Sequence, residues 1–125
     1  MGQSYRELLV WKKSVQLVKA LYLATTKFPS DELYGLRSQM RRAAVSIPSN
    51  IAEGQSRLTK GEFVNFLSIA RGSNAEVRSQ LTLARHLGFG DQMQITRCET
   101  QATQISKMLN GLIVSLKSTK VPSRP

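Results

Sequence analysis

The sequence predicts an all-α protein built as an antiparallel up-down-up-down four-helix bundle. Four separate segments carry apolar residues three and four positions apart, the spacing that places side chains on one face of an α-helix. No segment alternates apolar and polar residues between hairpin turns, so strands are not expected. Short links join the segments, and short links between long helices leave only antiparallel neighbours. The 125 residues suffice for one domain, expected over residues 1–117.

The first helix is expected over residues 5–27, because Pro29 ends it and Ser30 and Asp31 offer a cap for the next helix. Its core-facing stripe is expected to consist of Leu8, Trp11, Val15, Val18 and Tyr22. The second helix is expected to run from Leu33 to Gly54, with a proline in its interior. Its stripe is expected to consist of Leu33, Leu36, Met40, Ala44, Ile47 and Ile51.

Pro48 interrupts the second helix in principle, because a proline inside a helix removes one hydrogen bond and costs about 3 kcal/mol. Either the helix bends there, or it ends near Val45 and restarts with Ser46 as a cap. We expect the bend, since Ala44 and Ile51 keep facing one way across the proline and packing offsets the lost bond. The Ala44 carbonyl would then lack a backbone partner. Polar side chains close enough to satisfy it are Ser46, Ser49 and Asn50.

The third helix begins at "TKGE", residues 59–62, a capping-box signature in which Thr59 and Glu62 satisfy each other's free backbone groups. "GFGD" at 88–91 supplies a glycine stop and an aspartate cap for the fourth helix. The third helix is expected to bury Phe63, Phe66, Ala70, Ser73, Val77, Leu81 and Ala84. The fourth is expected to bury Ile95, Cys98, Ala102, Ile105, Leu109, Leu112 and Leu116. Residues 118–125 are expected to form a disordered basic tail.

The charge balance points to a polyanionic partner, because 18 Lys and Arg stand against eight Asp and Glu and leave a net charge of +10. A nucleic acid and an anionic membrane surface are the main candidates; a soluble basic protein without such a partner is the alternative. No signal peptide or membrane-spanning stretch is recognised, and Cys98 is the single cysteine. We therefore expect a cytoplasmic protein without membrane association.

The sequence offers little for catalysis. His86 is the only histidine, so a histidine-based metal site or nucleophile lacks partners. Glu53 is the one acid inside an apolar-periodic stretch, and an ion pair with Arg41, Arg42 or Arg57 explains it better than catalysis does. We expect no enzymatic activity, no metal and no cofactor.

The basic residues are better organised than the acids. Arg71, Arg78 and Arg85 recur every seven residues on one side of the third helix, and we call them the arginine ladder. They are expected to contact phosphates without base specificity, because guanidinium groups match phosphates and no Asn or Gln set is arrayed for base edges. A merely solvated face is the alternative. Further nucleic-acid contacts are expected at Arg37, Arg41, Arg42, Lys12, Lys13 and Lys19.

A second apolar line on the first helix predicts self-association, because a monomer rarely leaves so wide an apolar face in water. The predicted subunit interface consists of Val10, Leu17, Leu21 and Ala24, with Phe28 beside it. A ring of subunits would multiply each phosphate contact by avidity.

Three stretches of the chain carry a resemblance: "LLVWKKSVQLV", "FPSDELYGLRSQMRRAAVSIPSNIAEGQSR" and "EFVNFLSIARGSNAEVRSQL". Over residues 5–116 the chain resembles the four-helix-bundle protein family encoded within intervening sequences of bacterial 23S ribosomal RNA genes. That family is similar to the accessory variability proteins of diversity-generating retroelements. The resemblance implies a bundle with a bent second helix and a ring-shaped homopentamer. It implies no established enzymatic function, and nucleic-acid binding as the usual proposal.

Together these observations predict a non-enzymatic oligomer that binds RNA or DNA electrostatically, as an accessory to an RNA-processing or reverse-transcribing partner. The alternative is a scaffold that uses its basic charge to bind an acidic protein partner. Affinity that falls steeply with salt favours the first, and salt-tolerant binding of one protein favours the second.

Overall fold

A computed structural model describes residues 2–32 and 35–118 of the chain, with side chains described from residue 5 onward. The four expected helices are confirmed, and no strand occurs in the described ranges. Leu33 and residues 119–125, where part of the second stripe and most of the tail were expected, lie outside the described residues. The elements are α1 (Gly2–Thr26), the short 3-10 helix η1 (Ser30–Glu32), α2 (Leu36–Gln55), α3 (Lys60–Leu87) and α4 (Gln92–Ser118).

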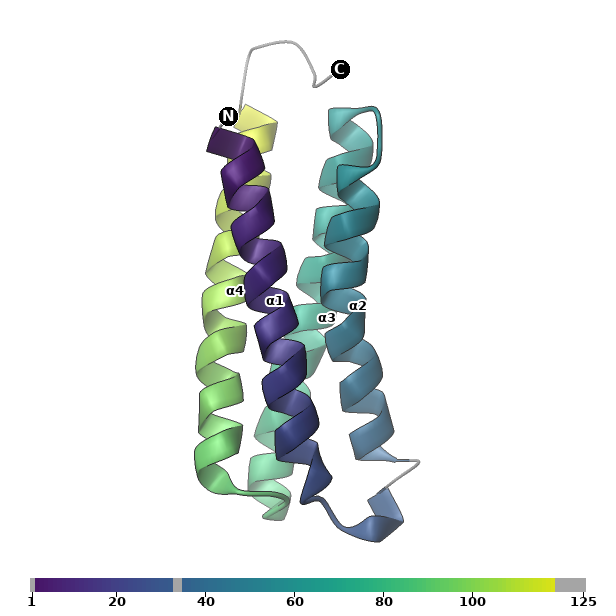
Figure 1. The fold of residues 1–125 in the computed structure, drawn as a ribbon, viewed down its shortest axis with the longest axis vertical. Helices are drawn as coiled ribbons and strands as arrows, with labels where there is room; N and C mark the ends of the chain where they lie inside the picture. The colour runs from purple at the N-terminus through teal and green to yellow at the C-terminus, as the bar shows by residue number, and fades with distance from the viewer. Residues whose placement is uncertain (1, 33–34, 119–125) are drawn as a thin grey trace.

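The four helices lie side by side along one long axis (Figure 1). The chain descends through α1, returns through α2, descends again through α3 and returns through α4, so that the start of α1 and the end of α4 share one end of the molecule. Helix α1 packs on α2 and α4, and α3 packs on the same two helices. Helices α1 and α3 are therefore diagonal neighbours, and their outward faces point to opposite corners of the bundle.

The core stripe of α4 is confirmed at every expected position. Cys98, near the start of this stripe, is fully buried, as expected for a small core residue. The stripe holds because its spacing of three and four residues keeps one face turned inward over the whole helix. The structure adds Ile113 to that face; its buried residues are Ile95, Cys98, Ala102, Ile105, Leu109, Leu112, Ile113 and Leu116.

The structure reverses the expected faces of α1. The line predicted as a subunit interface is the inward face, since Val10, Leu17, Leu21 and Ala24 are at most 1% exposed and Phe28 beside it is 4% exposed. The line predicted as the core lies mostly on the outer side: Leu8 is 49% and Tyr22 41% exposed, and Trp11, Val15 and Val18 are half-buried, with Trp11 and Val18 still packed against the core. The predicted interface residues are thus wrong, because the monomer itself buries them.

A polar residue in the middle of the buried line explains the error. The inward line includes Ser14, which is fully buried and whose hydroxyl donates to the Trp11 carbonyl at 2.7 Å. That bond satisfies the hydroxyl locally, so Ser14 enters the core without a partner on another helix. The spacing of apolar residues alone therefore favoured the other line as the core-facing one, because its side chains are larger and no polar residue interrupts it.

Helix α2 continues through Pro48, so the alternative of a break with a restart at Ser46 is wrong. Its stripe residues Leu36, Met40, Ala44, Ile47 and Ile51 are buried as expected. A small polar cluster sits beside the proline: Asn50 Nδ2 donates to the Ser46 carbonyl at 2.8 Å, and Ser46 Oγ lies 2.7 Å from Ser73 Oγ of α3. The bend of α2 and the unpaired Ala44 carbonyl stay predictions.

The start of α2 lies later than the expected cap at Ser30 and Asp31. Those residues enter η1 instead, and the Glu32 carboxylate accepts a hydrogen bond from the Leu36 amide at 2.9 Å. The cap is displaced because the 3-10 turn and Gly35 separate the Ser-Asp pair from the first helical residue. A carboxylate at this end also complements the helix dipole.

The ends of α3 and the start of α4 follow the sequence signals. Thr59 Oγ1 accepts from the Glu62 amide at 3.1 Å, and its hydroxyl contacts the Glu62 carboxylate at 3.2 Å, which replaces the expected return bond to the Thr59 amide. Gly88 ends α3 with φ of 72°, a left-handed conformation that glycine adopts without strain. Asp91 Oδ1 accepts from the Met93 amide at 2.8 Å and caps α4.

Helix α3 differs from its expected stripe at two positions. Phe66 and Ser73 are half-buried, while Leu67 and Asn74, one residue later in each case, take the inward places. Asn74 is 1% exposed, and its Nδ2 donates to the Ala102 carbonyl of α4 at 2.8 Å. The amide nitrogen thus pairs with a backbone group across the helix interface, while Asn74 Oδ1 has no hydrogen-bond partner among the described residues.

Helices α2 and α3 approach closely at Gly54, which is buried. A Cβ placed there would stand 2.9 Å from both Phe63 Cδ1 and Phe66 Cβ. Real Cβ atoms almost never make such short contacts. The glycine is therefore required by space, and it allows the two phenylalanines to pack directly on the α2 backbone.

Cys98 should make stability fall at alkaline pH. Burial raises the pKa of its thiol to about 11, whereas an unfolded cysteine titrates near 8.5. Between those values the unfolded chain loses a proton that the native state keeps, so the free energy of unfolding should decrease as the pH rises. Comparing Cys98→Ala with the parent by urea denaturation across this range isolates the effect. Parallel pH profiles for the two proteins would contradict it.

Candidate nucleic-acid interface

The arginine ladder is not a row of three free cations. Arg71 and Arg78 are exposed, but Arg71 Nη1 donates to Asn110 Oδ1 of α4 at 3.1 Å. Arg85 is half-buried in contacts with α4. Of the three ladder arginines, only Arg78 keeps its guanidinium free of hydrogen bonds and ion pairs within residues 2–32 and 35–118. The ladder therefore offers less than the sequence predicted, because α4 engages two of its three members.

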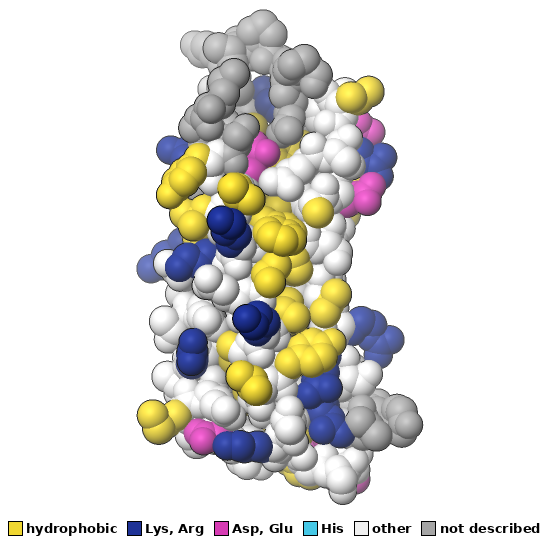
Figure 2. Space-filling view, viewed as in Figure 1, with side chains coloured by type: hydrophobic (Ala, Val, Ile, Leu, Met, Phe, Trp, Pro, Cys, Tyr) yellow, Lys and Arg dark blue, Asp and Glu magenta, His cyan; other side chains and the backbone are white. Residues whose placement is uncertain are grey.

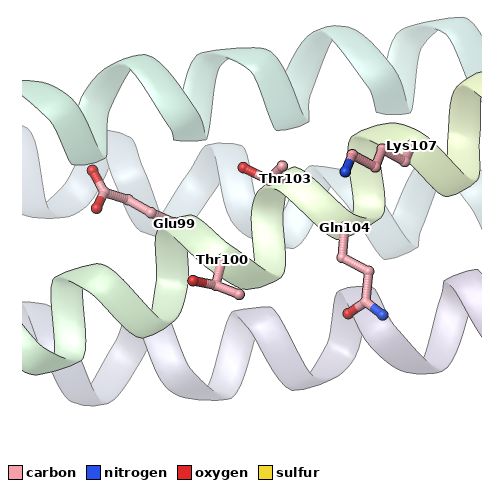
Figure 3. Close-up of a pocket in the computed structure, with 5 residues that line it drawn as sticks. All are labelled: Glu99, Thr100, Thr103, Gln104 and Lys107. Atoms are coloured by element: carbon pink, nitrogen blue, oxygen red, sulfur yellow. The ribbon is translucent and has the colours of Figure 1, made fainter.

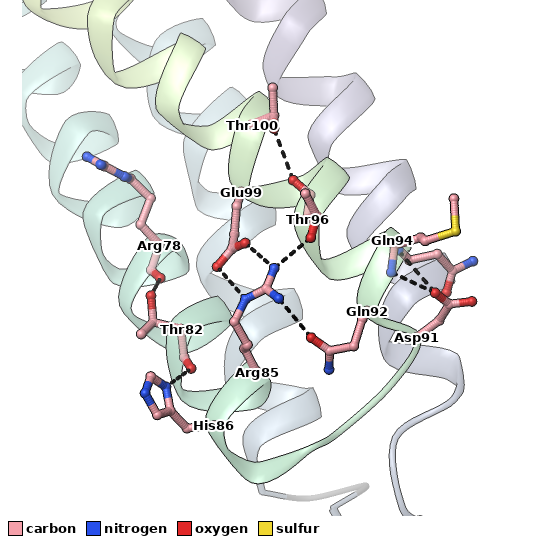
Figure 4. A network of polar contacts seen from close by, with 11 residues as sticks. Arg78, Thr82, Arg85, His86, Asp91, Gln92, Gln94, Thr96, Glu99 and Thr100 are labelled. Carbon is pink, nitrogen blue, oxygen red and sulfur yellow. Dashed lines mark hydrogen bonds and ion pairs between the residues drawn. The ribbon is translucent and has the colours of Figure 1, made fainter.

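Arg85 joins the ends of α3 and α4 (Figure 4). Its guanidinium forms an ion pair with Glu99 at 2.5 Å and donates to Gln92 Oε1 at 2.8 Å and to Thr96 Oγ1 at 2.6 Å. The hydrogen bond to Glu99 raises the pKa of Arg85 above its usual range. Since its donors already have acceptors, this arginine is a structural link between two helices.

Replacing Arg85 with glutamine should lower the midpoint of thermal unfolding more than the same change at Arg78. The first change removes the link and leaves the Glu99 carboxylate without its partner, while the second removes only an exposed charge. Circular dichroism melts at low and high salt measure both midpoints, and high salt should narrow the difference. Equal midpoints at low salt would mean that the network adds no stability.

The three arginines of α2 also differ in whether other parts of the bundle engage their side chains. Arg41 Nε donates to Thr25 Oγ1 at 2.9 Å, its Nη2 donates to the Tyr22 carbonyl at 3.1 Å, and its guanidinium lies 4.4 Å from the Tyr22 ring centroid. It therefore supplies positive charge at the C-terminal end of α1, whose last turn has no basic residue. Arg37 is half-buried, whereas Arg42 is exposed. Arg42 alone of the three remains well placed for a partner.

The lysines of α1 face a different corner of the molecule. Lys12 and Lys19 are exposed and Lys13 is half-buried, and no ion pair holds any of them among the described residues. Because α1 and α3 are diagonal, these lysines and the arginine ladder do not form one continuous surface on a single chain. The predicted basic clusters on α1 and α3 therefore stay separate.

Within residues 2–32 and 35–118, the grooves between or along the helices include three shallow ones. One of about 410 Å³ lies on α4 (Figure 3), where the five side chains that line it include both Glu99 and Lys107. A second, of about 270 Å³, lies between α2 and α3 and places Arg42 beside Glu76. In both grooves a carboxylate partly offsets the positive charge, so each favours an anion less than a groove without a carboxylate would.

The third groove, of about 420 Å³, lies between α1 and α4, and we call it the α1/α4 groove. Two cations and three amides meet there beside a small apolar wall. No carboxylate is among its lining residues, which are Gln16, Lys19, Ala20, Leu23, Gln94, Arg97 and Gln101.

Sequence reasoning found only Lys19 of this set. The expected absence of a Gln or Asn array is wrong, because the amides come from two helices that are distant in sequence. A signal was present within α4, where Gln94, Arg97 and Gln101 each precede a buried residue of the core stripe by one position.

The remaining polar residues are explained by local contacts. Glu53 forms its ion pair with Arg57, one of the three arginines considered, and the Arg57 guanidinium lies 4.8 Å from the Phe66 ring centroid. His86 is exposed, and its Nδ1 lies 2.9 Å from the Thr82 carbonyl. Within the described part of the chain, no three His, Cys, Asp or Glu side chains gather where a metal ion could bind. None of its helices has the length and hydropathy to span a bilayer.

An apolar band covers the outer face of α1. In Figure 2 hydrophobic side chains gather down the middle of the viewed face, with basic side chains on both sides of the band. The α1 residues on this outer side, which we call the outer stripe, are Leu8, Trp11, Val15, Val18 and Tyr22. A contiguous apolar surface of this kind is typical of an interaction site.

Comparisons with known proteins agree with the fold. A family model described as 23S rRNA-intervening sequence protein matches residues 6–111. The chain is also similar to the crystal structure of a protein with unknown function from the S23 ribosomal protein family of Bacteroides thetaiotaomicron. The two share 24% identity with a TM-score of 0.78, over 87% of this chain and 98% of that one. That identity supports a shared fold alone. No curated protein matches the chain.

Proposed function

Because the chain belongs to the 23S rRNA-intervening sequence protein family, we propose that it is a non-enzymatic protein that binds RNA or DNA through phosphate contacts. The observation that carries the proposal is the unbalanced charge of +10. Among the described residues only Lys27, Arg57 and Arg85 are held in ion pairs. Most of the basic side chains therefore remain available to a polyanion, and a polyanion gains affinity by releasing its counterions to them.

The contacts that we propose are the exposed basic residues without acidic partners. Arg78 and Arg42 would contribute from α3 and α2, and Lys12 and Lys19 from α1. Arg41 and Arg85 are left out, because their donors are used within the bundle. Phosphate contacts that lie at separate corners of one chain suit a protein that binds nucleic acid as an oligomer. In this role it would be an accessory to an RNA-processing or reverse-transcribing partner.

We propose a homo-oligomer, a ring of five as the family resemblance implies, that assembles through the outer stripe of α1. The monomer leaves this apolar stripe partly uncovered, with Leu8 and Tyr22 both more than 40% exposed. Burying it against a second copy would remove this surface from water at about 25 cal/mol per Å². It would also repeat every basic cluster around the ring and raise avidity.

Binding is tested by fluorescence anisotropy with labelled RNA and DNA over a range of salt concentrations. We expect log affinity to fall linearly with log salt for every sequence alike. Absence of binding, or binding that ignores salt, would overturn the proposal. Salt-tolerant binding to one acidic protein would favour the scaffold alternative.

Assembly is tested by light scattering on Leu8→Glu and on the matched variant Val114→Glu, which changes an exposed valine of α4. The parent and the α4 variant should be oligomers, and the α1 variant should shift toward a monomer because it places a charge in the interface. A monomeric parent, or an unchanged Leu8→Glu, would contradict the proposed interface.

A further inference from the structure

We propose that the α1/α4 groove holds one nucleotide unit of a single-stranded nucleic acid. Lys19 and Arg97 would contact its phosphates, and the glutamine amides would contact the edge of its base. The inference rests on the nucleic-acid binding proposed above. It adds where on the protein the ligand binds and that the ligand is single-stranded.

Charge is the first argument. Neither Lys19 nor Arg97 has an ion-pair or side-chain hydrogen-bond partner within residues 2–32 and 35–118, and both line the same groove. No carboxylate lines it, in contrast to the grooves that contain Glu99 and Glu76. Two unpaired cations on facing helices, without an acid between them, favour an anion that bridges the two helices.

The glutamine amides are the second argument. The side-chain oxygens of Gln94 and Gln101 are enclosed and have no hydrogen-bond partner. An enclosed acceptor without a donor costs free energy, and a ligand that supplies the donor recovers it. We expect rotation about the last side-chain torsion, which is broad, to turn each amide toward the groove when a ligand binds. An amide offers one donor group and one acceptor, the combination that base edges present.

Size and shape favour a single strand. The groove of about 420 Å³ falls within the range of small-ligand sites, roughly 300–1,000 Å³. Ala20 and Leu23 form its apolar wall, and Leu23, at 65% exposure, is open to contact with a base. A duplex keeps its bases stacked inside, whereas a single strand can turn one base into a narrow groove.

The charge contacts are tested on the full chain by anisotropy with labelled oligouridine, the matching single-stranded DNA and a duplex of equal length. The double variant Lys19→Gln, Arg97→Gln is compared with Lys107→Gln, Lys117→Gln, which removes two exposed charges elsewhere on α4. We expect the groove variant to bind single strands about tenfold more weakly than the control variant, with a salt slope shallower than the parent's by about 1.4, or two contacts at about 0.7 each. Comparable losses for both sugars would show that the two cations contact the phosphates of RNA and DNA alike, and a loss confined to RNA would show that the site also depends on the 2′-hydroxyl.

The amide contacts are tested separately with Gln94→Met, Gln101→Met, which keeps the charge and nearly the length of both side chains. We expect single-strand affinity to fall several-fold while the salt slope and duplex affinity stay the same. Crosslinking with oligonucleotides that contain 4-thiouridine should label peptides around residues 16–23 and 94–101.

The outcomes separate this inference from the proposed function. A parent that binds nucleic acid with groove and control variants equally weakened would overturn the groove and leave general phosphate binding intact. Equal losses of affinity for duplex and single-stranded nucleic acid would overturn the proposed preference for single strands. A parent that shows no salt-dependent binding would overturn both.

Discussion

Replacing Leu17 with alanine should lower the free energy of unfolding by about 2–5 kcal/mol, the range for removing a leucine side chain from a packed core. Leu17 has no exposed surface in the monomer. The same substitution at Leu8, which is 49% exposed on the outer side of α1, should cost less than about 1 kcal/mol. Urea denaturation followed by circular dichroism measures both changes.

The pair of variants also separates the core from an interface. A core residue stabilises each chain at every protein concentration, whereas an interface residue makes stability depend on concentration. The loss at Leu17 should therefore be the same in dilute and concentrated samples. A loss at Leu17 that disappears on dilution would return that residue to the subunit interface where the sequence placed it.

Gly54→Ala should destabilise the protein by about 1–2 kcal/mol, although alanine is the better helix former. Overpacking a tight contact costs about 1–3 kcal/mol, and the helix preference returns up to about 1 kcal/mol. The new methyl group would lie 2.9 Å from Phe66 Cβ, which is anchored to the backbone and cannot swing away.

Two other glycines provide matched controls, because alanine there should increase the stability of the protein instead of decreasing it. Gly72 in α3 and Gly111 in α4 are exposed, and an added Cβ meets nothing within 4 Å at either position. Alanine there should stabilise the protein by about 0.5–1 kcal/mol. Thermal melts of the three single variants test the pattern, and stabilisation by Gly54→Ala would show that α2 and α3 are not in close contact at that position.

How far the sequence predicts the fold depends on how many apolar lines a helix carries. Helix α4 has one line at unbroken spacing, and every predicted core position is buried. Helix α1 has two lines, and Ser14 interrupts the one that turns inward. Helical spacing identifies a stripe but not the neighbour that covers it, so only the packing of α2 and α4 against α1 decides between them.

The candidate site was harder to predict, because the sequence shows where the basic residues are but not which acidic or polar side chains they contact in the folded protein. Arg85 finds Glu99 fourteen residues further along the chain, and Arg41 finds Thr25 sixteen residues earlier. Contacts between helices of this kind leave no mark on local spacing. Capping signals, by contrast, lie within a few residues, which is why Thr59 and Asp91 were predicted correctly as caps.

The hydrogen bond from Asn74 to the Ala102 carbonyl bears on how α4 chooses its position along α3. The inward residues of α4 repeat every seven positions, so a slide of one heptad would still bring apolar side chains against apolar side chains. The amide restricts that freedom, since a slipped helix would have to offer it another accessible carbonyl in the core or leave it unpaired. One buried asparagine thus favours the alignment that places the small Ala102 beside it over those that would place the bulkier Ile95 or Leu109 there.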